Sequence, residues 1–180
     1  LTRRPIMKVL HIEAGMHLYG GALQVVFLLR GLRPLGVDCI LACPEGSAIA
    51  SPAQPHARVC TMPMKGDLDI GMLARLRRLI RQESPDLVHL HSRRGSDIWG
   101  ALAARLEGIP VVTISDGIRQ VLLSEGVPQA KISCVLSAVD TEQYCPDRQH
   151  MDWFRETFQI ATDELTIGMV AQFIPRKGHT

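Results

Sequence analysis

The sequence predicts an α/β fold in which helices cover both faces of a parallel sheet. Short apolar runs alternate along the chain with longer segments whose apolar residues recur every three or four positions. Strands that alternate with helices favour crossover connections, which build parallel sheets. The length of 180 residues suits one domain of this kind and a fragment of another. We therefore expect a Rossmann-like sheet, followed by the first strand of a second domain.

The elements follow from these patterns in chain order. Seven short apolar runs are the predicted strands: residues 6–12, 37–43, 58–62, 87–91, 110–113, 132–136 and 165–171. The predicted helices lie between or after them: residues 22–35, 69–83, 96–107, 115–125 and 151–158. Met72, Leu76 and Ile80 share one face of the second helix, as an amphipathic helix requires. Ser115 stands where it can cap the fourth helix.

A polar stretch that carries Pro146 predicts the boundary between two parts of the chain. We assign residues 1–150 to an N-terminal Rossmann-like domain. Residues 151–180 are then a linker and the start of a truncated C-terminal domain, which begins with the strand at 165–171.

Composition excludes several functional classes. Hydrophobic residues make up 46% and charged residues 21% of the chain, the balance of a globular protein rather than a disordered one. No apolar run is long enough for a transmembrane helix. A net charge of +2 and 4% aromatic residues do not favour a nucleic-acid partner. Five cysteines without a CxxC pair suit reduced thiols and a cytoplasmic location.

A glycine-rich turn follows the first predicted strand. Gly15, Gly20 and Gly21 lie between this strand and the first helix, where helical N–H groups are free to bind an anion. The spacing is not GxGxxG, and a P-loop would need Lys and Ser/Thr where Gly21 and Ala22 stand. We expect the backbone here to approach a phosphate or a sugar. The alternative is a tight turn that needs glycine for positive φ.

The fourth strand carries His89 and ends at His91, before a loop of Ser92, Arg93 and Arg94. Ligands gather at strand ends in open α/β sheets, and a cationic loop suits an anionic substrate. The alternative is that the arginines are only solvated. We interpret His89 as a core residue and place it on the opposite strand face from His91, so that no metal site is expected.

Four arginines occupy the helix at 69–83, opposite its leucines. These are Arg75, Arg77, Arg78 and Arg81. Such a row can lie on an anionic membrane, which leaves peripheral contact with the inner face of a membrane open. More commonly it is a solvated helix face.

Four stretches together resemble the N-terminal half of a family 4 glycosyltransferase with the GT-B fold. The first is the strand and its Gly20–Gly21 turn. The others are residues 84–92 with 103–113, residues 114–119 with 125–128 and 131–133, and residues 138–141 with the late basic turn at 175–178.

The resemblance implies two facing domains, with the acceptor held by the N-terminal one and a nucleotide-sugar donor by the C-terminal one. It implies sugar transfer with retention of configuration, without a metal or other cofactor, to a glycan or lipid-linked acceptor. This would serve bacterial cell-surface polysaccharide or lipopolysaccharide synthesis. Gly20, Gly21 and Lys177 match positions near the donor diphosphate. The residues expected to line the acceptor cleft are His17, His91, Ser92, Arg93 and Arg94, and no catalytic residue is assigned.

The sequence also departs from the family. An αβ stretch of about 30 residues, the size of a crossover unit, is expected between Thr113 and Ile114 and is missing here. The acidic donor-sugar motif is missing too, so we expect these 180 residues alone to be inactive. Two alternatives stay open: a non-catalytic module that binds a phosphorylated sugar or nucleotide, and a GT-B sugar-nucleotide epimerase.

Overall fold

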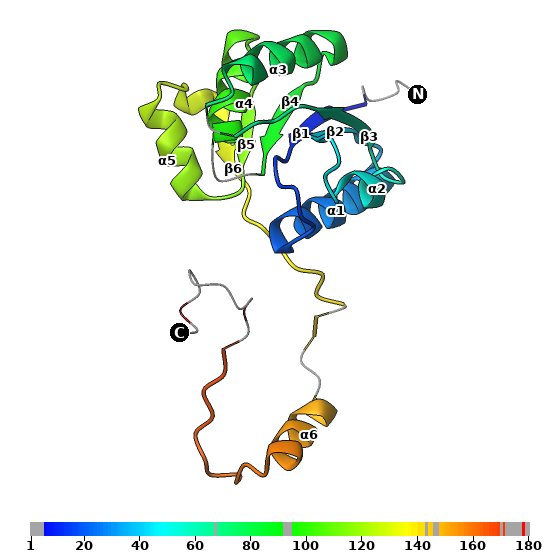
Figure 1. Cartoon of the computed structure of the whole chain (residues 1–180), viewed down its shortest axis with the longest axis vertical. Helices are drawn as coiled ribbons and strands as arrows, with labels where there is room; N and C mark the ends of the chain where they lie inside the picture. Colours follow the sequence, from blue (N-terminus) through cyan, green and yellow to red (C-terminus); the bar gives the residue numbers. More distant parts are fainter. Residues whose placement is uncertain are drawn as a thin grey trace. The chain divides into compact units, whose positions relative to one another are not determined.

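The computed structural model describes residues 6–66, 68–91, 95–142, 144–145, 148–169, 171 and 178. The chain divides into two compact units, Leu1–Asp140 and Thr141–Thr180. The first unit contains a sheet with helices, and the described residues of the second unit include the helix α6 (Figure 1).

Six parallel strands form the sheet of the first unit, in the order β3-β2-β1-β4-β5-β6. This order is that of a doubly wound Rossmann-like fold. The strands are β1 (Lys8–Ile12), β2 (Asp38–Pro44), β3 (Arg58–Met62), β4 (Leu87–Leu90), β5 (Val111–Thr113) and β6 (Ile132–Cys134). The predicted fold class is therefore confirmed.

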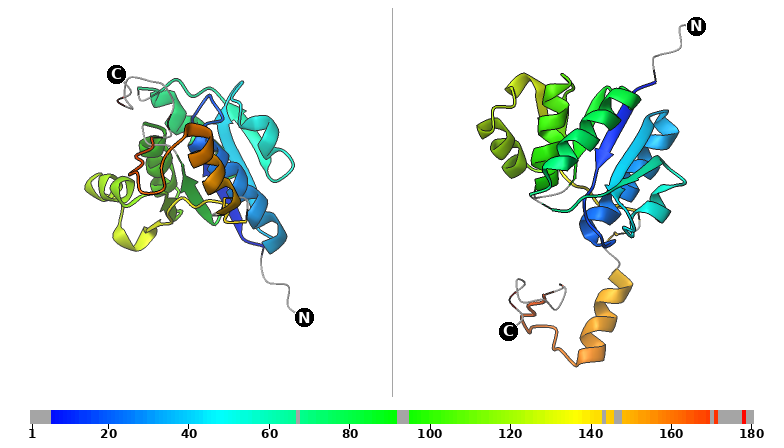
Figure 2. Two further views of the ribbon diagram at one scale, coloured as in Figure 1. Left: turned by 90° about the horizontal axis from the view of Figure 1, so that it is seen from below. Right: turned by 45° about the horizontal axis from the view of Figure 1, so that its top comes forward.

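Helices pack on both faces of this sheet (Figure 2). One face carries α1 (Gly20–Leu32) and α2 (Ala50–Ala53), and the other carries α3 (Ile70–Glu83), α4 (Gly95–Leu106) and α5 (Asp116–Ser124). Short 3-10 turns follow α1 at Arg33–Leu35 and precede β6 at Gln129–Lys131. The cap predicted at Ser115 is present, because its hydroxyl accepts from the Ile118 N–H at 3.3 Å.

Side chains alternate between the two faces of the sheet along each strand, so the buried apolar residues form two separate clusters. Leu10 and Ile12 of β1 pack with apolar residues of α3 and α4, and Leu41 of β2 packs with α1 on the opposite face. His11 lies between Leu10 and Ile12, so its side chain projects to the α1 face. This alternation fixes which strand residues can reach the ends of α1.

The second unit holds α6 (Arg148–Phe158). The strand predicted at 165–171 is not formed at residues 165–169 or 171, and Val170 lies outside the described residues. An isolated strand leaves its backbone N–H and C=O groups without ladder partners, so an apolar run alone does not hold it extended. The assignment of 151–180 to a second domain stays a prediction.

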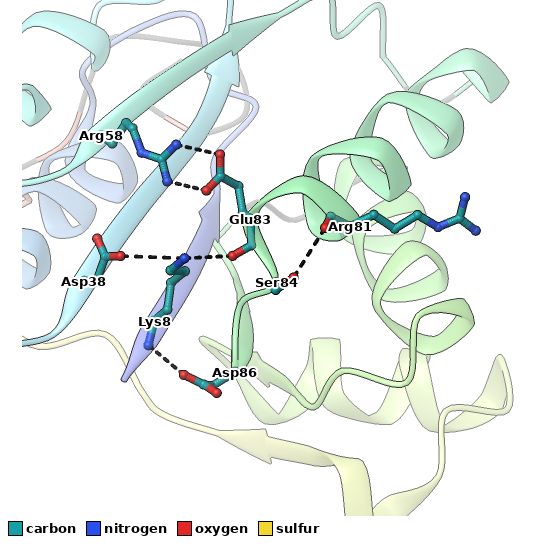
Figure 3. A network of polar contacts seen from close by, with 7 residues as sticks. All are labelled: Lys8, Asp38, Arg58, Arg81, Glu83, Ser84 and Asp86. Carbon is teal, nitrogen blue, oxygen red and sulfur yellow. Dashed lines mark hydrogen bonds and ion pairs between the residues drawn. The ribbon is translucent and has the colours of Figure 1, made fainter. Parts of the chain in front are cut away.

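A polar network fixes the amino ends of the strands against the end of α3 (Figure 3). The Lys8 N–H donates to Asp86 Oδ2 at 2.8 Å, and its Nζ donates to the Glu83 carbonyl at 2.9 Å. Arg58 of β3 donates twice to the Glu83 carboxylate, once at 2.6 Å to Oε1. This pair lowers the pKa of Glu83. One acidic side chain therefore joins α3 to the edge of the sheet.

We expect Glu83→Gln to lower the free energy of unfolding by about 1 kcal/mol, the usual worth of a charged pair at a surface. The measurement is urea unfolding at neutral pH, with Glu125→Gln as the control because Glu125 is exposed in the same unit. Equal stability of the two variants would show that the Arg58 contact contributes nothing.

Candidate functional site

The carboxyl ends of β1 and β4 meet where the strand order reverses. β1 is flanked by β2 and by β4, and the chain leaves β1 and β4 toward opposite faces of the sheet. Open α/β sheets bind ligands in the crevice at such a point. The His91 N–H donates to the Ile12 carbonyl at 3.1 Å and so holds these two strand ends together.

Gly20 and Gly21 are the first two residues of α1, and both are exposed. Neither has a positive φ, and a Cβ atom added to either would meet no heavy atom within 4 Å. The tight-turn explanation therefore fails for both glycines. Tyr19 precedes them with extended backbone and supplies no side-chain cap. The first N–H groups of the helix are thus open to an anion approaching from outside.

The segment before α1 is fixed by its own contacts. The Gly15 N–H donates to buried Glu13 Oε1 at 2.7 Å, and a Cβ at Gly15 would lie 2.7 Å from the same oxygen. The Ala48 N–H donates to the Met16 carbonyl at 3.0 Å. Gly15 is therefore needed for a close approach inside the chain, unlike Gly20 and Gly21. Exposed His17 lies on this segment, with its ring centroid 5.1 Å from that of Tyr19.

The placement of His89 and His91 on opposite strand faces is wrong. Side chains alternate at every residue, so residues two apart share a face, and these two ring centroids are only 4.0 Å apart. His11 joins them from β1, where the register pairs it with His89. Its Nδ1 lies 3.0 Å from His91 Nε2. Sequence reasoning missed His11, because the contact joins residues on two strands far apart in the chain.

All three rings are buried, and burial is the main influence on their charge. It lowers the pKa of His89 to about 4. Burial and then the nearby His89 lower the pKa of His11 to about 3. The pKa of His91 falls well below its ordinary value for the same reasons, with His11 adding to the effect. The cluster is therefore uncharged at neutral pH.

A pocket of about 460 Å³ lies between α1 and the segment after β6. His89 and His91 line it together with apolar residues of α1 and residues 135–140. Two polar contacts close one side: the Ala138 N–H donates to Gln24 Oε1 at 3.1 Å, and Arg30 pairs with Asp140 at 2.8 Å. The pocket thus begins next to the histidine cluster and extends along α1.

The structure brings some of the predicted site residues to one edge of the sheet. Gly20 and Gly21 begin α1 beyond the carboxyl end of β1, His17 lies on the segment before them, and His91 directly follows β4. Ser92, Arg93, Arg94 and Lys177 lie outside the described residues. Their roles stay predictions.

Three of the four arginines on α3 pair with carboxylates of the chain. Arg75 contacts Asp69, and Arg77 and Arg81 donate to Glu107 at 2.7 and 2.9 Å. These pairs favour the interpretation of a solvated helix face. In the part of the chain that the structure describes, no helix has the length and apolarity needed to cross a membrane.

Comparison with solved structures shows the same fold in proteins that include two solved with UDP or UDP-GlcNAc bound. HepE from Anabaena, solved in complex with UDP, is 12% identical with a TM-score of 0.57, covering 85% of this chain and 50% of that one. The UDP-GlcNAc 2-epimerase from Neisseria meningitidis, bound to UDP-GlcNAc, is 16% identical with a TM-score of 0.54, covering 87% and 55%. MurG from Acinetobacter baumannii is 16% identical with a TM-score of 0.52, covering 74% and 44%.

This chain spans about half the length of those structures. At these sequence identities the similarity establishes only the fold. That fold is the Rossmann-like half of a GT-B structure. No curated protein sequence matches the chain. The profile of Glycosyltransferase Family 4 matches residues 19–114, which begin at the cap of α1 and include the histidines of β4. That match covers more than half of the 180 residues, so the chain belongs to glycosyltransferase family 4.

Proposed function

We propose that this chain is the acceptor-side domain of a retaining glycosyltransferase. The enzyme transfers a sugar from a nucleotide-sugar to a glycan or lipid-linked acceptor in bacterial cell-surface polysaccharide synthesis. The observation that carries the proposal is the open N-terminus of α1. Family membership and the UDP found in HepE support a nucleotide diphosphate as the group that it meets.

Neither Gly20 nor Gly21 is required to be glycine by contacts inside the chain. Their φ angles suit any residue, and a Cβ at either position would lie in open space. The fold of this unit therefore does not require glycine there. A ligand that must come within hydrogen-bond distance of the backbone does require it, because a side chain would hold that ligand away.

The chemistry needed at this point is stabilisation of negative charge. When the sugar leaves the donor, charge accumulates on the departing diphosphate. N–H groups at a helix start and the positive end of the helix dipole stabilise such an oxyanion without reorganising. Lys177 is the proposed second contact to the diphosphate. His17, His91, Ser92, Arg93 and Arg94 are the proposed acceptor side, and no metal ion is assigned to the transfer step.

The test is Gly21→Val in the full-length enzyme. We expect transfer to fall by roughly a hundredfold or more, the usual cost of losing an oxyanion contact, while the fold is kept because the new side chain meets nothing. Gly117→Val is the matched control. Gly117 is also exposed and second in its helix, but Ser115 caps that helix. Full activity of Gly21→Val, measured as product formed from a nucleotide-sugar, would refute the diphosphate assignment.

An epimerase is the second candidate, because solved UDP-GlcNAc 2-epimerases share this fold. Product analysis with the full-length enzyme distinguishes the two. An epimerase alters the sugar of the donor without any acceptor, whereas the proposed transferase makes a new glycosidic bond only when an acceptor is present. A protein that binds the nucleotide-sugar and forms neither product would be the binding module.

A further inference from the structure

The histidine cluster His11, His89 and His91 has the composition and spacing of a metal site. One nitrogen from each ring can be chosen so that all three lie within 4.8 Å of one another. In a zinc site each Zn–N bond is about 2.0–2.1 Å, which places tetrahedral nitrogen ligands roughly 3.3 Å apart. His11 Nδ1 and His91 Nε2, at 3.0 Å, already have nearly this separation. The third nitrogen lies within 4.8 Å of these two and would have to approach them by rotation of its ring.

Hydrogen bonding within the described part of the chain does not use up the nitrogens of this cluster. His11 Nε2 and His89 Nε2 are buried and have no partner among the described residues. A buried polar atom without a partner destabilises the folded state. An ion held by His11 Nδ1 and His91 Nε2 would supply the partner that His89 Nε2 lacks, while His11 Nε2 lies outside that set of ligand atoms.

Burial also leaves the three rings in the protonation state that binds metal. Neutral imidazole is the form that binds metal, and burial keeps all three rings in that form at neutral pH. Metal binding would therefore displace little or no proton from the rings. His89 and His91 also line the pocket along α1, which leaves a fourth ligand position accessible to water or to a small molecule.

We propose that His11, His89 and His91 bind one divalent transition-metal ion, for which zinc is the best match to three imidazoles and an open position. This site departs from the resemblance, which implies no metal. It shares His91 with the proposed acceptor side but not the open N-terminus of α1, and metal binding is measured without the transfer reaction.

The first experiment titrates the metal-free 180-residue chain with Zn²⁺ against a chromophoric chelator, and with Co²⁺ by absorption. We expect one equivalent to bind, with the visible bands of four-coordinate Co²⁺ and no near-ultraviolet thiolate band. The thiolate band matters because the chain has five free cysteines. No binding, or binding with a thiolate band, would overturn the proposal.

The second experiment assigns the ligands. Mutation of residues that only support the metal ligands lowers metal affinity by about 10–100-fold. We therefore expect His89→Gln and His91→Gln, which each remove a ligand, to lower the affinity at least about a hundredfold. His56→Gln is the control, since His56 lies outside the cluster. Circular dichroism checks that each variant folds. Equal loss in the control, or unchanged affinity in both cluster variants, would refute the site.

A third measurement uses the native chain, so its result does not depend on whether a variant folds. X-ray absorption of the zinc-loaded native chain counts imidazole ligands from their multiple scattering. Three imidazoles and one oxygen or nitrogen ligand that is not an imidazole are expected. One imidazole, or any sulfur at the metal, would show that the ion binds elsewhere and that the cluster is only a packed, hydrogen-bonded part of the core.

Discussion

Gly100→Val is expected to destabilise the first unit by about 3 kcal/mol, at the upper end of the cost of overpacking a core. Gly100 lies in the middle of α4 and is buried against the sheet. A Cβ added there would lie 2.7 Å from Leu90 Cδ2 and 3.0 Å from Ile12 Cδ1. Both of those side chains are fully buried, so neither methyl group has space to retreat. The helix must then move away from β1 and β4.

The measurement is urea unfolding followed by the fluorescence of Trp99, which packs against the same core. The background is Trp153→Phe, since the chain has two tryptophans. Gly31→Val is the control, because Gly31 is also helical but a Cβ there meets nothing within 4 Å. We expect the control to change stability by no more than about 0.5 kcal/mol, the difference in helix propensity. Equal effects at both glycines would contradict the close approach of α4.

Most of the sheet could be predicted because local pattern and burial agree. The strand at 58–62 matches β3 residue for residue, and the helix at 69–83 differs from α3 by one residue at its start. In such segments the apolar residues recur with the period of the helix or strand that they form. The sequence pattern and the packing in the structure therefore predict the same element. The four-residue helix α2 was missed, since it is too short to show a period.

The site was only partly predictable, for a different reason. Gly20 and Gly21 at the start of α1 stand out because the sequence itself shows a residue without a side chain at each position. The histidine cluster does not, because His11 and His91 are 80 positions apart and meet only through the parallel pairing of β1 with β4. The prediction placed His89 and His91 on opposite faces because it applied the strand period wrongly. Two residues separated by one neighbour lie on the same face of a strand. Correct use of this period would have placed two of the three histidines of the cluster on one face.

Acidification in the presence of a metal chelator is expected to destabilise the first unit steeply. The loss begins at about pH 6.5, where a histidine of the unfolded chain takes up its proton. It continues down to the folded-state pKa values, which are about 4 for His89 and about 3 for His11. Below the unfolded pKa the unfolded state binds more protons than the folded one, so stability falls as pH falls. At about pH 5 the loss is about 2 kcal/mol for each of the two histidines. Together this is a large share of the roughly 5–15 kcal/mol that stabilises a domain.

The experiment compares urea unfolding at about pH 7.5 and about pH 5, a window above the ordinary pKa of carboxylates. In His89→Gln the loss across this window should shrink by about 2 kcal/mol, since one buried proton acceptor is gone. Glu83→Gln is the control. Its pKa is lowered in the folded state, so its contribution is present above the ordinary carboxylate pKa and disappears only below this window. The control should therefore lower stability equally at both pH values. The contrary result is a native chain with the same free energy of unfolding at both pH values. That result would mean that the three rings take up protons without unfolding, and it would refute the buried neutral cluster.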